Sequence, residues 1–321
     1  MKAIKVIDGK AALQEAEIPK IGPNDILIRI KATAANRADL MQKKGLYPPP
    51  PGASEILGLE CSGIVDAVGN KVTSRKVGDE VCALLAGGGY AEYVACPEFQ
   101  AIPKPTNLNW DEAASLPEVY ATCWLNLFIE GNLNTGNKVL FHAGASGIGT
   151  AGIQLCKAFN CKSFVTAGDK EKIKFCIDLG ASEGAVRGDK MFNEVQGWVP
   201  EGFDIILDPV GANYFEDNLK VLGLEGRLII IGLMGGMEAN INLGHLMMKR
   251  QKIIGSTIRA RSEELKKIVM NELHKKVWPF IESNQIKPVI HEVLDISETE
   301  KAHQIMEENQ NIGKLVLSLG N

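Results

Sequence analysis

The spacing of apolar residues gives the chain two successive patterns. The first half carries short β-type runs at Ile26–Ala32, Gly63–Val68 and Tyr90–Ala95. Turn-rich stretches at Tyr47–Gly52 and Gly87–Gly89 interrupt them. Short strands separated by glycine and proline turns predict a twisted antiparallel or barrel-like sheet over residues 1 to about 120.

From Lys138 onward, apolar strands alternate with segments of helical periodicity. This alternation is typical of βαβ units on a parallel sheet and therefore of an α/β fold. A further strand is expected at Lys314–Leu319. The predicted strands of the parallel sheet are Lys138–His142, Lys162–Thr166, Asp204–Leu207, Arg227–Ile231 and Lys252–Ser256.

Helical spacing also accounts for two cysteines and one helix start. Cys156 and Cys176 each fall on an apolar helix face, so we expect both in the core. Ser297, with Glu300 three residues later, resembles a capping box that opens a helix near the C-terminal end. The inner face of that helix is expected to carry Ala302, Ile305 and Met306.

A glycine turn connects the first parallel strand to its helix and reads Gly144-Ala-Ser146-Gly147-Ile148-Gly149. In dinucleotide sites such glycines let the backbone approach a pyrophosphate, and the helix N-terminus meets its charge. The spacing departs from the commonest Gly-x-Gly-x-x-Gly pattern, and a tight turn alone would also explain it. Because four further βα units follow, the dinucleotide interpretation is favoured.

The segment after the second strand bears on the choice of nicotinamide cofactor. Asp169 lies 20 positions after Gly149, where an acid that bonds the ribose 2′-hydroxyl favours NAD. Lys170, Lys172 and Arg187 are candidates to hold a 2′-phosphate instead, which favours NADP. The structural alternative is a solvated helix start with Asp169 as its N-cap.

Composition excludes several classes of protein. The chain has 321 residues, 45% apolar and 23% charged, which indicates a globular protein of about two domains. A net charge of -4 with a pI of about 5.9 leaves no basic footprint for nucleic acid or an anionic membrane. The longest apolar run, Leu228–Met234, is far shorter than the roughly 20 residues of a spanning helix.

Two further observations bear on location. Lys2, Lys5 and Asp8 interrupt the apolar residues of the first segment, so no secretory signal is expected. The seven cysteines form no Cys-x-x-Cys pair. We therefore expect a reducing, cytoplasmic location.

Several motifs in a fixed order point to one family. The chain resembles the zinc-free quinone oxidoreductases of the medium-chain dehydrogenase/reductase superfamily, and most of all the p53-inducible quinone oxidoreductase group. The resemblance covers nearly the whole chain. Besides the glycine turn, it is carried by the segments Asn36–Gln42, Gly45–Ser54, Leu57–Glu60, Val77–Asp79, Gly232–Gly236 and Asn309–Leu317.

The resemblance implies a fold of two domains. Residues 1–120 and 265–321 are expected to form a GroES-like catalytic domain, a partly open β-barrel. Residues 121–264 are expected to form a Rossmann domain, a doubly wound parallel sheet that binds NAD(P). The family also implies a homodimer in which the edge strand around Lys252–Ile258 pairs with its counterpart.

Two zinc ligands of the metal-dependent relatives are missing here. The zinc-dependent relatives have a cysteine at the position of Asn36 and a histidine at that of Leu59, while the neighbouring Glu60 is retained. The cysteines also lack the close spacing of a structural zinc site. We expect no metal. Without a Lewis acid to stabilise an alkoxide, alcohol oxidation is disfavoured, whereas a quinone needs only a hydrogen-bond donor.

The expected catalytic residues are Tyr47, Asn36 and Asp39. In relatives the loop that carries Tyr47 borders the nicotinamide, so Tyr47 is the candidate donor and the other two would line the same floor. Tyr47 also has a structural interpretation, as a ring packed against the proline run Pro48–Pro51. Asn36 has one too, as a buried amide that satisfies loop backbone.

Motif alignment implies where the cofactor lies. Thr122 is expected near the nicotinamide amide, Gly147 and Ile148 at the pyrophosphate, and Leu233 with Met234 along the cofactor's inner half. Asn309 is expected to approach from the C-terminal segment. The remaining expected cofactor-binding residues are Gly144, Ser146, Gly168, Asp169, Lys172, Arg187 and Gly232.

The function that these features predict is NADPH-dependent reduction of quinones by hydride transfer without zinc. NADH is possible, because Asp169 and Arg187 depart from the residues common among relatives. Two alternatives stay open: an alkenal or enoyl reductase of the same fold, and a non-catalytic nucleotide-binding protein such as a crystallin. The expected partners are a small-molecule quinone and a second copy of the chain, with no nucleic acid and no membrane.

Overall fold

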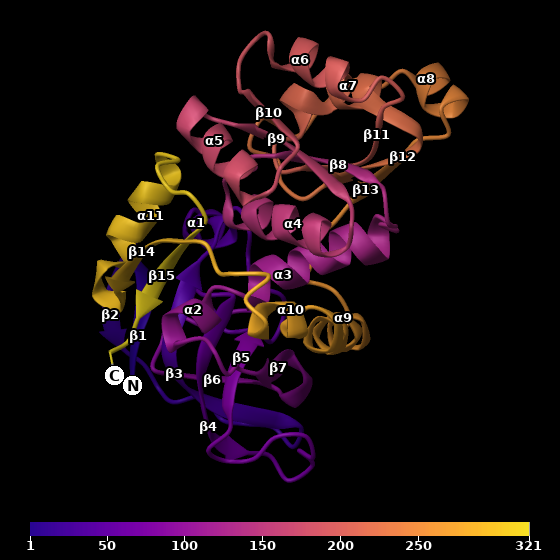
Figure 1. Cartoon of the computed structure of the whole chain (residues 1–321). Coiled ribbons are helices and arrows are strands. Elements are labelled where there is room, and N and C mark those ends of the chain that lie inside the picture. Colours follow the sequence, from indigo (N-terminus) through magenta and orange to yellow (C-terminus); the bar gives the residue numbers. More distant parts are fainter. Residues whose placement is uncertain (321) are drawn as a thin grey trace. The chain divides into compact units, whose positions relative to one another are not determined.

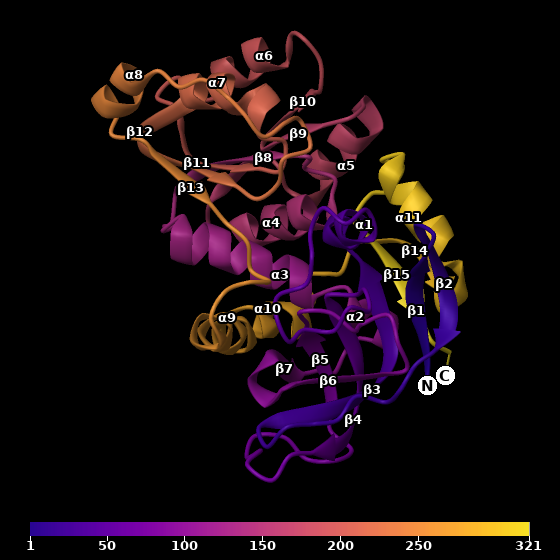
Figure 2. The same cartoon turned by 180° about the vertical axis from the view of Figure 1, so that it is seen from behind.

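The computed structural model describes residues 1–320, and the chain forms two compact units (Figures 1 and 2). One unit combines Met1–Ala121 with the segment that starts at Ile258, and the other is Thr122–Thr257. The family resemblance implies the second boundary after residue 264. It falls earlier because the last strand of the parallel sheet already ends at Gly255.

The first unit is built on a mostly antiparallel sheet. Within residues 1–320 its path of neighbouring strands is β14 (Ile290–Asp295), β15 (Lys314–Ser318), β3 (Asp25–Ala35), β4 (Glu60–Val68), β5 (Glu80–Leu84) and β7 (Ala101–Pro103). β6 (Tyr93–Pro97) pairs with β3 beside this path, and β1 (Lys2–Ile7) and β2 (Lys10–Glu15) form a separate hairpin. β3 pairs with β15, β4 and β6, so it is the central strand of the unit.

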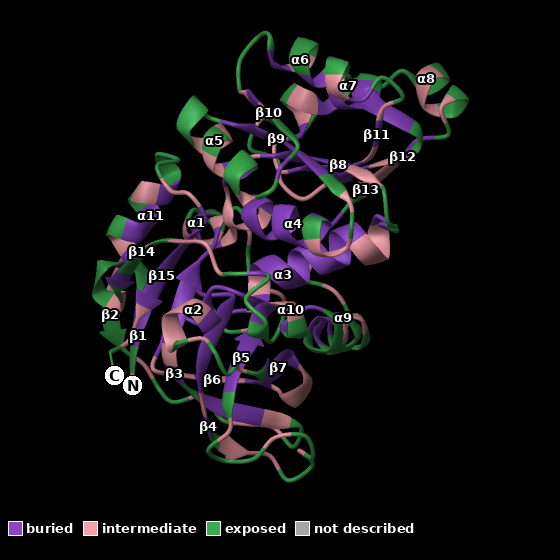
Figure 3. Ribbon diagram, in the orientation of Figure 1, coloured by how far each residue is buried: buried purple, intermediate pink, exposed green. Residues whose placement is uncertain are grey.

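Short helices surround this sheet, and Figure 3 shows the middle of the sheet buried. The apolar core includes Ile26, Ile28, Val65 and Val81. The helices are α1 (Arg37–Lys43), α2 (Trp110–Ala114), α3 (Pro117–Cys123), α9 (Glu263–Lys276), α10 (Trp278–Glu282) and α11 (Thr299–Glu307), with the 3-10 turns η1 (Glu98–Gln100) and η3 (Ile296–Glu298).

The capping box predicted at Ser297 and Glu300 is wrong. The capping box is formed by Asp295 and Glu298 around η3, which precedes α11. Glu300 instead accepts hydrogen bonds from the Ala11 amide and from Lys43 Nζ, both at 2.8 Å. The prediction fails because the chain makes a 3-10 turn before the helix, so the cap lies one turn earlier.

The second unit is a doubly wound parallel sheet. Its spatial order is β10 (Glu183–Val186), β9 (Lys162–Ala167), β8 (Lys138–His142), β11 (Phe203–Asp208), β12 (Leu222–Ile230) and β13 (Lys252–Gly255). Every neighbouring pair is parallel, which confirms the predicted fold. The order reverses between β8 and β11, and ligands of such sheets bind at the reversal point.

Helices cover both faces of this sheet. The helical segments are η2 (Trp124–Glu130), α4 (Gly147–Ala158), α5 (Lys170–Leu179), α6 (Met191–Trp198), α7 (Ala212–Val221) and α8 (Leu243–Met248). Leu140 packs in the cluster that includes α6 and α7, and Phe141 meets α4 at Gly152. Consecutive strand residues face opposite sides, so α4 lies across the sheet from α6 and α7, as Figure 1 shows.

The sheet leaves β13 as an outer strand. The predicted homodimer would pair this strand with its counterpart, and that pairing stays a prediction. β10 is the other edge, and the sequence pattern does not predict it, because Gly184 and Ala185 leave it little apolar side chain. None of the helices among residues 1–320 has the length and apolar character needed to cross a membrane.

An added methyl group is expected to have opposite effects on stability at two helical glycines of the second unit. A Cβ at Gly152 of α4 would overlap the buried Phe141 ring, whereas a Cβ at Gly197 of α6 meets nothing within 4 Å. We expect Gly152→Ala to lower the free energy of unfolding by about 1–3 kcal/mol through overpacking. Gly197→Ala is expected to raise it by up to about 1 kcal/mol through helix propensity.

Denaturant midpoints of the two variants and the wild type measure this difference. Shifts of the same sign in both variants would contradict the described packing of α4 on β8.

Candidate active site

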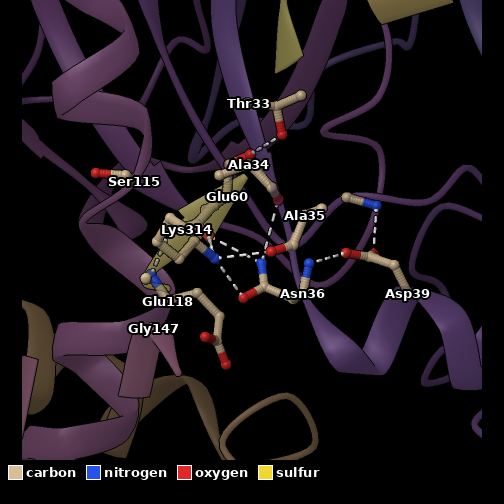
Figure 4. A network of polar contacts seen from close by, with 12 residues as sticks. Thr33, Ala34, Ala35, Asn36, Asp39, Glu60, Ser115, Glu118, Gly147 and Lys314 are labelled. Atoms are coloured by element: carbon tan, nitrogen blue, oxygen red, sulfur yellow. Dashed lines mark hydrogen bonds and ion pairs between the residues drawn. The ribbon is translucent and has the colours of Figure 1, made fainter. Parts of the chain in front are cut away.

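Three neighbouring strands of the first unit bring Asn36, Glu60 and Lys314 together. Leu315 of β15 is paired with Ala35 of β3, so Lys314 lies beside Asn36. Glu60 begins β4, the strand on the other side of β3. Figure 4 shows the three side chains converging at this point. The register of the sheet therefore builds the cluster from residues far apart in sequence.

The Lys314 ammonium is surrounded by oxygen atoms. Its Nζ lies 2.7 Å from Glu60 Oε1, 2.7 Å from Asn36 Oδ1 and 3.0 Å from the Ala35 carbonyl oxygen. The Lys314 side chain is 5% exposed and that of Glu60 is fully buried. Glu60 Oε2 accepts a hydrogen bond of 2.9 Å from the Glu118 amide in the first turn of α3. This ion pair is therefore buried and fully hydrogen-bonded.

The side-chain amide of Asn36 is committed to the same cluster. Its Nδ2 donates to Glu60 Oε1 at 2.8 Å and to the Ala34 carbonyl at 3.2 Å, while Oδ1 accepts from Lys314. An amide has two N–H donors, and both are used here. The structural interpretation of Asn36 as a buried, satisfied amide therefore fits the geometry.

Asp39 caps α1 from inside the fold. Its Oδ2 accepts from the Asn36 amide at 2.8 Å and its Oδ1 from the Gly58 amide at 2.9 Å. The Tyr90 hydroxyl lies 3.2 Å from Oδ2. Burial raises the pKa of Asp39 to about 6, and these hydrogen bonds limit the rise. The carboxylate thus fixes the start of α1 to the loop at Gly58.

Tyr47 differs from Asn36 and Asp39 because its side-chain hydroxyl is not used in hydrogen bonds within the described residues. The Arg259 guanidinium carbon lies 5.3 Å from the centre of its ring, and Arg259 Nη1 donates to its backbone carbonyl at 3.4 Å. Burial raises the pKa of Tyr47, and the positive charge of Arg259 opposes that rise.

Arg259 is itself held in place from several sides. It is 4% exposed, its Nε donates to the Ala86 carbonyl at 2.8 Å and its Nη2 to Gln42 Oε1 at 2.7 Å. Lys266 Nζ donates to its backbone carbonyl at 2.7 Å. The Tyr47 ring therefore lies against a cation that hydrogen bonds hold in place.

In the second unit, the glycine turn follows β8 at the reversal point of the sheet. The Gly144 amide donates to the Thr166 carbonyl at 2.8 Å, and a Cβ on Gly144 would overlap Val165. Ser146 is the N-cap of α4, with Oγ accepting from the Gly149 amide at 3.1 Å, and Gly147 with Ile148 begin the helix. The turn is thus packed so tightly that only glycine fits at Gly144.

The predicted ribose and phosphate residues follow the ends of adjacent strands. β9 ends at Ala167 beside Val186, so Gly168 and Arg187 are neighbours; a Cβ on Gly168 would lie 3.7 Å from Arg187 Nη2. Asp169 is the N-cap of α5 and accepts from the Lys172 amide at 2.8 Å. This confirms the capping interpretation of Asp169, and a contact of its side chain with ribose stays a prediction.

The other cofactor candidates lie in three places. Gly232, Leu233 and Met234 follow β12, and the last two side chains are half-exposed. Thr122 is buried in α3 at the start of the second unit. Asn309 belongs to the first unit, where its Oδ1 accepts from Arg37 Nη2 at 2.9 Å. Contacts of all these residues with a cofactor stay predictions.

Sequence reasoning missed Lys314 and Arg259 as site residues. In the sequence, Lys314 is one residue of the motif Asn309–Leu317, and Glu60 is a retained neighbour of the missing zinc ligands. The available signal for Lys314 is a charged residue directly before the apolar run Leu315–Leu317. Such a signal cannot show which strands pair, so it could not join Lys314 to Glu60 across 254 positions.

Two family models match the chain, one in each half of the sequence. The model described as "Alcohol dehydrogenase GroES-like domain" matches residues 22–106. The model described as "Zinc-binding dehydrogenase" matches residues 147–275.

The second description names zinc, which proteins hold with cysteine, histidine and carboxylate side chains. At two positions where the zinc-dependent relatives carry a ligand, this chain has Asn36 and Leu59. Among residues 1–320, no group of three or more histidine, cysteine, aspartate or glutamate side chains is placed to hold a metal ion. The positive charge beside Glu60 is the Lys314 ammonium.

Curated relatives match over the length of the chain. The quinone oxidoreductase of Mus musculus is 29% identical over 332 residues, which cover 99% of this chain and 98% of that protein. The synaptic vesicle membrane protein VAT-1 homolog of Danio rerio is also 29% identical and covers 98% of this chain. The chain spans only 66% of the length of that second relative.

Solved structures of oxidoreductases also match over the full length of the chain. A structure described as an NAD-dependent alcohol dehydrogenase is 30% identical with a TM-score of 0.86, and the match covers 100% of both chains. A mycobacterial protein solved in complex with NADPH is 26% identical with a TM-score of 0.88, over 99% of both chains. Because two family models match residues 22–106 and 147–275 and a solved relative 30% identical matches over the full length of both chains, the chain belongs to the medium-chain dehydrogenase/reductase superfamily of oxidoreductases.

Proposed function

We propose that this protein is a zinc-independent NADPH:quinone oxidoreductase. The observation that carries the proposal is Tyr47, whose hydroxyl is uncommitted within residues 1–320 while its ring lies against the Arg259 cation. The full-length likeness to a quinone oxidoreductase supports the same substrate class.

The chemistry of a quinone suits a site with one neutral donor. Bound NADPH supplies the hydride. The anion that hydride addition leaves on a quinone is delocalised and phenolate-like, so hydrogen bonding stabilises it without a metal. Tyr47 can donate that hydrogen bond and its proton, and the Arg259 cation beside the ring favours negative charge on the phenol oxygen.

Asn36 and Asp39 fit a positioning role better than a chemical one. Both donors of the Asn36 amide are used inside the protein, and the Asp39 carboxylate faces backbone amides and Tyr90. They therefore set the start of α1, next to the loop that carries Tyr47.

A second candidate is reduction of a polarised carbon–carbon double bond. The observation in its favour is a 28% identical match to a segment of a highly reducing polyketide synthase of Aureobasidium melanogenum, over 93% of this chain and 14% of that protein. A hydrogen-bond donor at Tyr47 would serve an enone carbonyl as well as a quinone. The two candidate functions are distinguished by which substrate the enzyme reduces, a quinone or a polarised carbon–carbon double bond.

Replacing Tyr47 tests the role of its hydroxyl. We expect Tyr47→Phe to lower kcat with ortho- and para-quinones by about 10-fold or more, because a positioned proton donor is lost. The affinity for NADPH should not change. Tyr93→Phe, which changes a half-buried tyrosine on β6, is the control and should leave kcat unaltered.

Steady-state kinetics with quinones, a 2-alkenal and a crotonyl thioester measure both candidates at once. Turnover of the alkenal or thioester without turnover of quinones would replace the first function with the second. Full activity of Tyr47→Phe would remove Tyr47 from the mechanism.

We propose NADPH rather than NADH as the cofactor. The glycine turn, with Ser146, Gly147 and Ile148 at the start of α4, would hold the pyrophosphate. Lys172, in the first turn of α5, and Arg187, beside Gly168, would hold the 2′-phosphate. The tight packing of Gly144 and Gly149 supports close approach of a ligand to this backbone.

A lysine pair on α5 tests the phosphate assignment. We expect Lys172→Ala to weaken NADPH binding by about 10-fold, the loss of one charge-assisted contact, with NADH binding unchanged. Lys174→Ala is the matched control, because Lys174 lies on the same helix paired with Asp178. Dissociation constants from fluorescence titration decide the point, and tighter binding of NADH by the wild type would instead make Asp169 the determinant.

The pH dependence of stability tests the assignment of Asp39. Its pKa is about 6 in the fold against 3.8 ordinarily, so the folded protein binds the extra proton between those values. The wild type should therefore gain on the order of 2–3 kcal/mol in free energy of unfolding, relative to Asp39→Asn, as the pH falls from 7 to about 4.

Urea unfolding of both proteins across that range gives the difference. Parallel curves for wild type and Asp39→Asn would show that the buried carboxylate is not the titrating group.

A further inference from the structure

Four buried polar side chains join the carboxyl ends of three strands in the parallel sheet. His142 ends β8, Thr166 is the last residue but one of β9, and Asp208 ends β11. Asn218 of α7 lies between Asp208 and His142 and is hydrogen-bonded to both. Each of the four is at most 3% exposed. We call these side chains the strand-end network.

The carboxylate of Asp208 sets the direction of every hydrogen bond in this network. Burial raises the pKa of Asp208 to about 6, and above that pH the carboxylate can only accept. Asn218 Nδ2 therefore donates to its Oδ2 at 3.1 Å, which turns Asn218 Oδ1 toward His142 Nε2 at 2.7 Å. Burial lowers the pKa of His142 to about 4, so its ring is neutral. Nε2 must carry the ring proton, and Nδ1 accepts from the Thr166 hydroxyl at 2.9 Å.

The same carboxylate holds the turn that follows β11. Its Oδ1 accepts from the Val210 amide at 2.6 Å, and both oxygens lie 3.2 Å from the Gly211 amide. The loop Gly232–Gly236 rests on this turn, since the Gly235 amide donates to the Val210 carbonyl at 2.7 Å. Gly211 has a φ of 81°, and a Cβ there would lie 2.9 Å from a carbonyl of that loop. Asp208 therefore supports two consecutive layers of backbone.

The loops that follow these strands are those that would hold the cofactor. The glycine turn follows β8, the segment Gly168–Lys172 follows β9, and the loop Gly232–Gly236 rests on the turn after β11. Ligands of such sheets bind beyond the carboxyl ends of the strands. A network that ties three of these ends together therefore fixes the spacing of the loops.

We propose that Asp208 is a positioning residue for the dinucleotide, which fixes the surrounding loops through Asn218, His142 and the turn after β11. The inference rests on the cofactor assignment under the proposed function. A residue that only stabilises the fold would affect the melting temperature alone. A positioning residue also changes the affinity of the folded protein for the dinucleotide.

Exchanging the carboxylate and the amide separates these two roles. In Asp208→Asn one acceptor oxygen becomes an NH2 donor that faces the NH2 group of Asn218. We expect Asn218 to turn over and the ring proton of His142 to move to Nδ1. Dinucleotide binding should weaken by about 10-fold, the effect of one unsatisfied buried group.

In the swap variant Asp208→Asn/Asn218→Asp, donor and acceptor have exchanged places. The carboxylate at position 218 can accept both from the new amide and from His142 Nε2. The Nε2 tautomer should therefore return, and the affinity should recover to within about threefold of the wild type, because the two substitutions are coupled.

Two measurements at about pH 8, where Asp208 is ionised, report these changes well below the melting temperature. Fluorescence titration with whichever reduced dinucleotide the wild type binds gives the affinities. Spectra of protein labelled with nitrogen-15 histidine give the tautomer, and His142→Gln identifies the signal.

Asp204→Asn is the matched control. Asp204 lies at the other end of β11, where its Oδ2 accepts from the Lys138 amide at 2.7 Å. This variant should lower the melting temperature without changing the dinucleotide affinity or the His142 tautomer.

Unchanged affinity in Asp208→Asn, or an equal loss in Asp204→Asn, would overturn the proposal and leave Asp208 with a structural role only. If Asp208→Asn does not fold, the swap variant decides. Folding and wild-type affinity of the swap support the proposal, and a swap that also fails to fold overturns it.

None of these readouts involves a quinone. A wild type that binds the dinucleotide but reduces no quinone would therefore remove the proposed substrate class and leave the role of Asp208 to be decided by the affinities.

Discussion

The buried ion pair between Lys314 and Glu60 is the interaction on which the first unit depends. Two charges removed from water are tolerated only when the remaining donors and acceptors are satisfied. Here Asn36, the Ala35 carbonyl and the Glu118 amide complete that set. The pair therefore fixes the register of β15, β3 and β4, and with it the place where α1 and α3 begin.

The second unit follows a different constraint, which is the close approach of backbone to backbone. Gly144 and Gly149 lie so near their neighbours that a side chain at either would displace them. Gly152 plays the same part where α4 rests on Phe141. Glycines allow the close packing at the carboxyl edge of the parallel sheet. In the sheet of the first unit, the Lys314–Glu60 ion pair organises the centre instead.

Local patterns predicted the parallel sheet well. The strand Lys138–His142 has its predicted bounds, and the helices that follow bury Cys156 and Cys176 as expected. At the end of that strand, His142 Nδ1 lies 2.9 Å from Thr166 Oγ1 and Nε2 lies 2.7 Å from Asn218 Oδ1. These features depend on residues close in sequence. The Lys314–Glu60 ion pair and the Arg259–Tyr47 contact join residues more than two hundred positions apart, which no local pattern encodes.

The position of β15 has a consequence for how the protein is made. It is the last strand in sequence order among residues 1–320, yet it lies inside its sheet, between β14 and β3. During translation, one edge of β3 therefore stays unpaired until β15 has been synthesised. Until then, Glu60 also lacks its ion-pair partner Lys314. The strands of the second unit come from one uninterrupted stretch and can pair earlier. The parallel sheet of the second unit can therefore form before the unit that carries Tyr47 is complete.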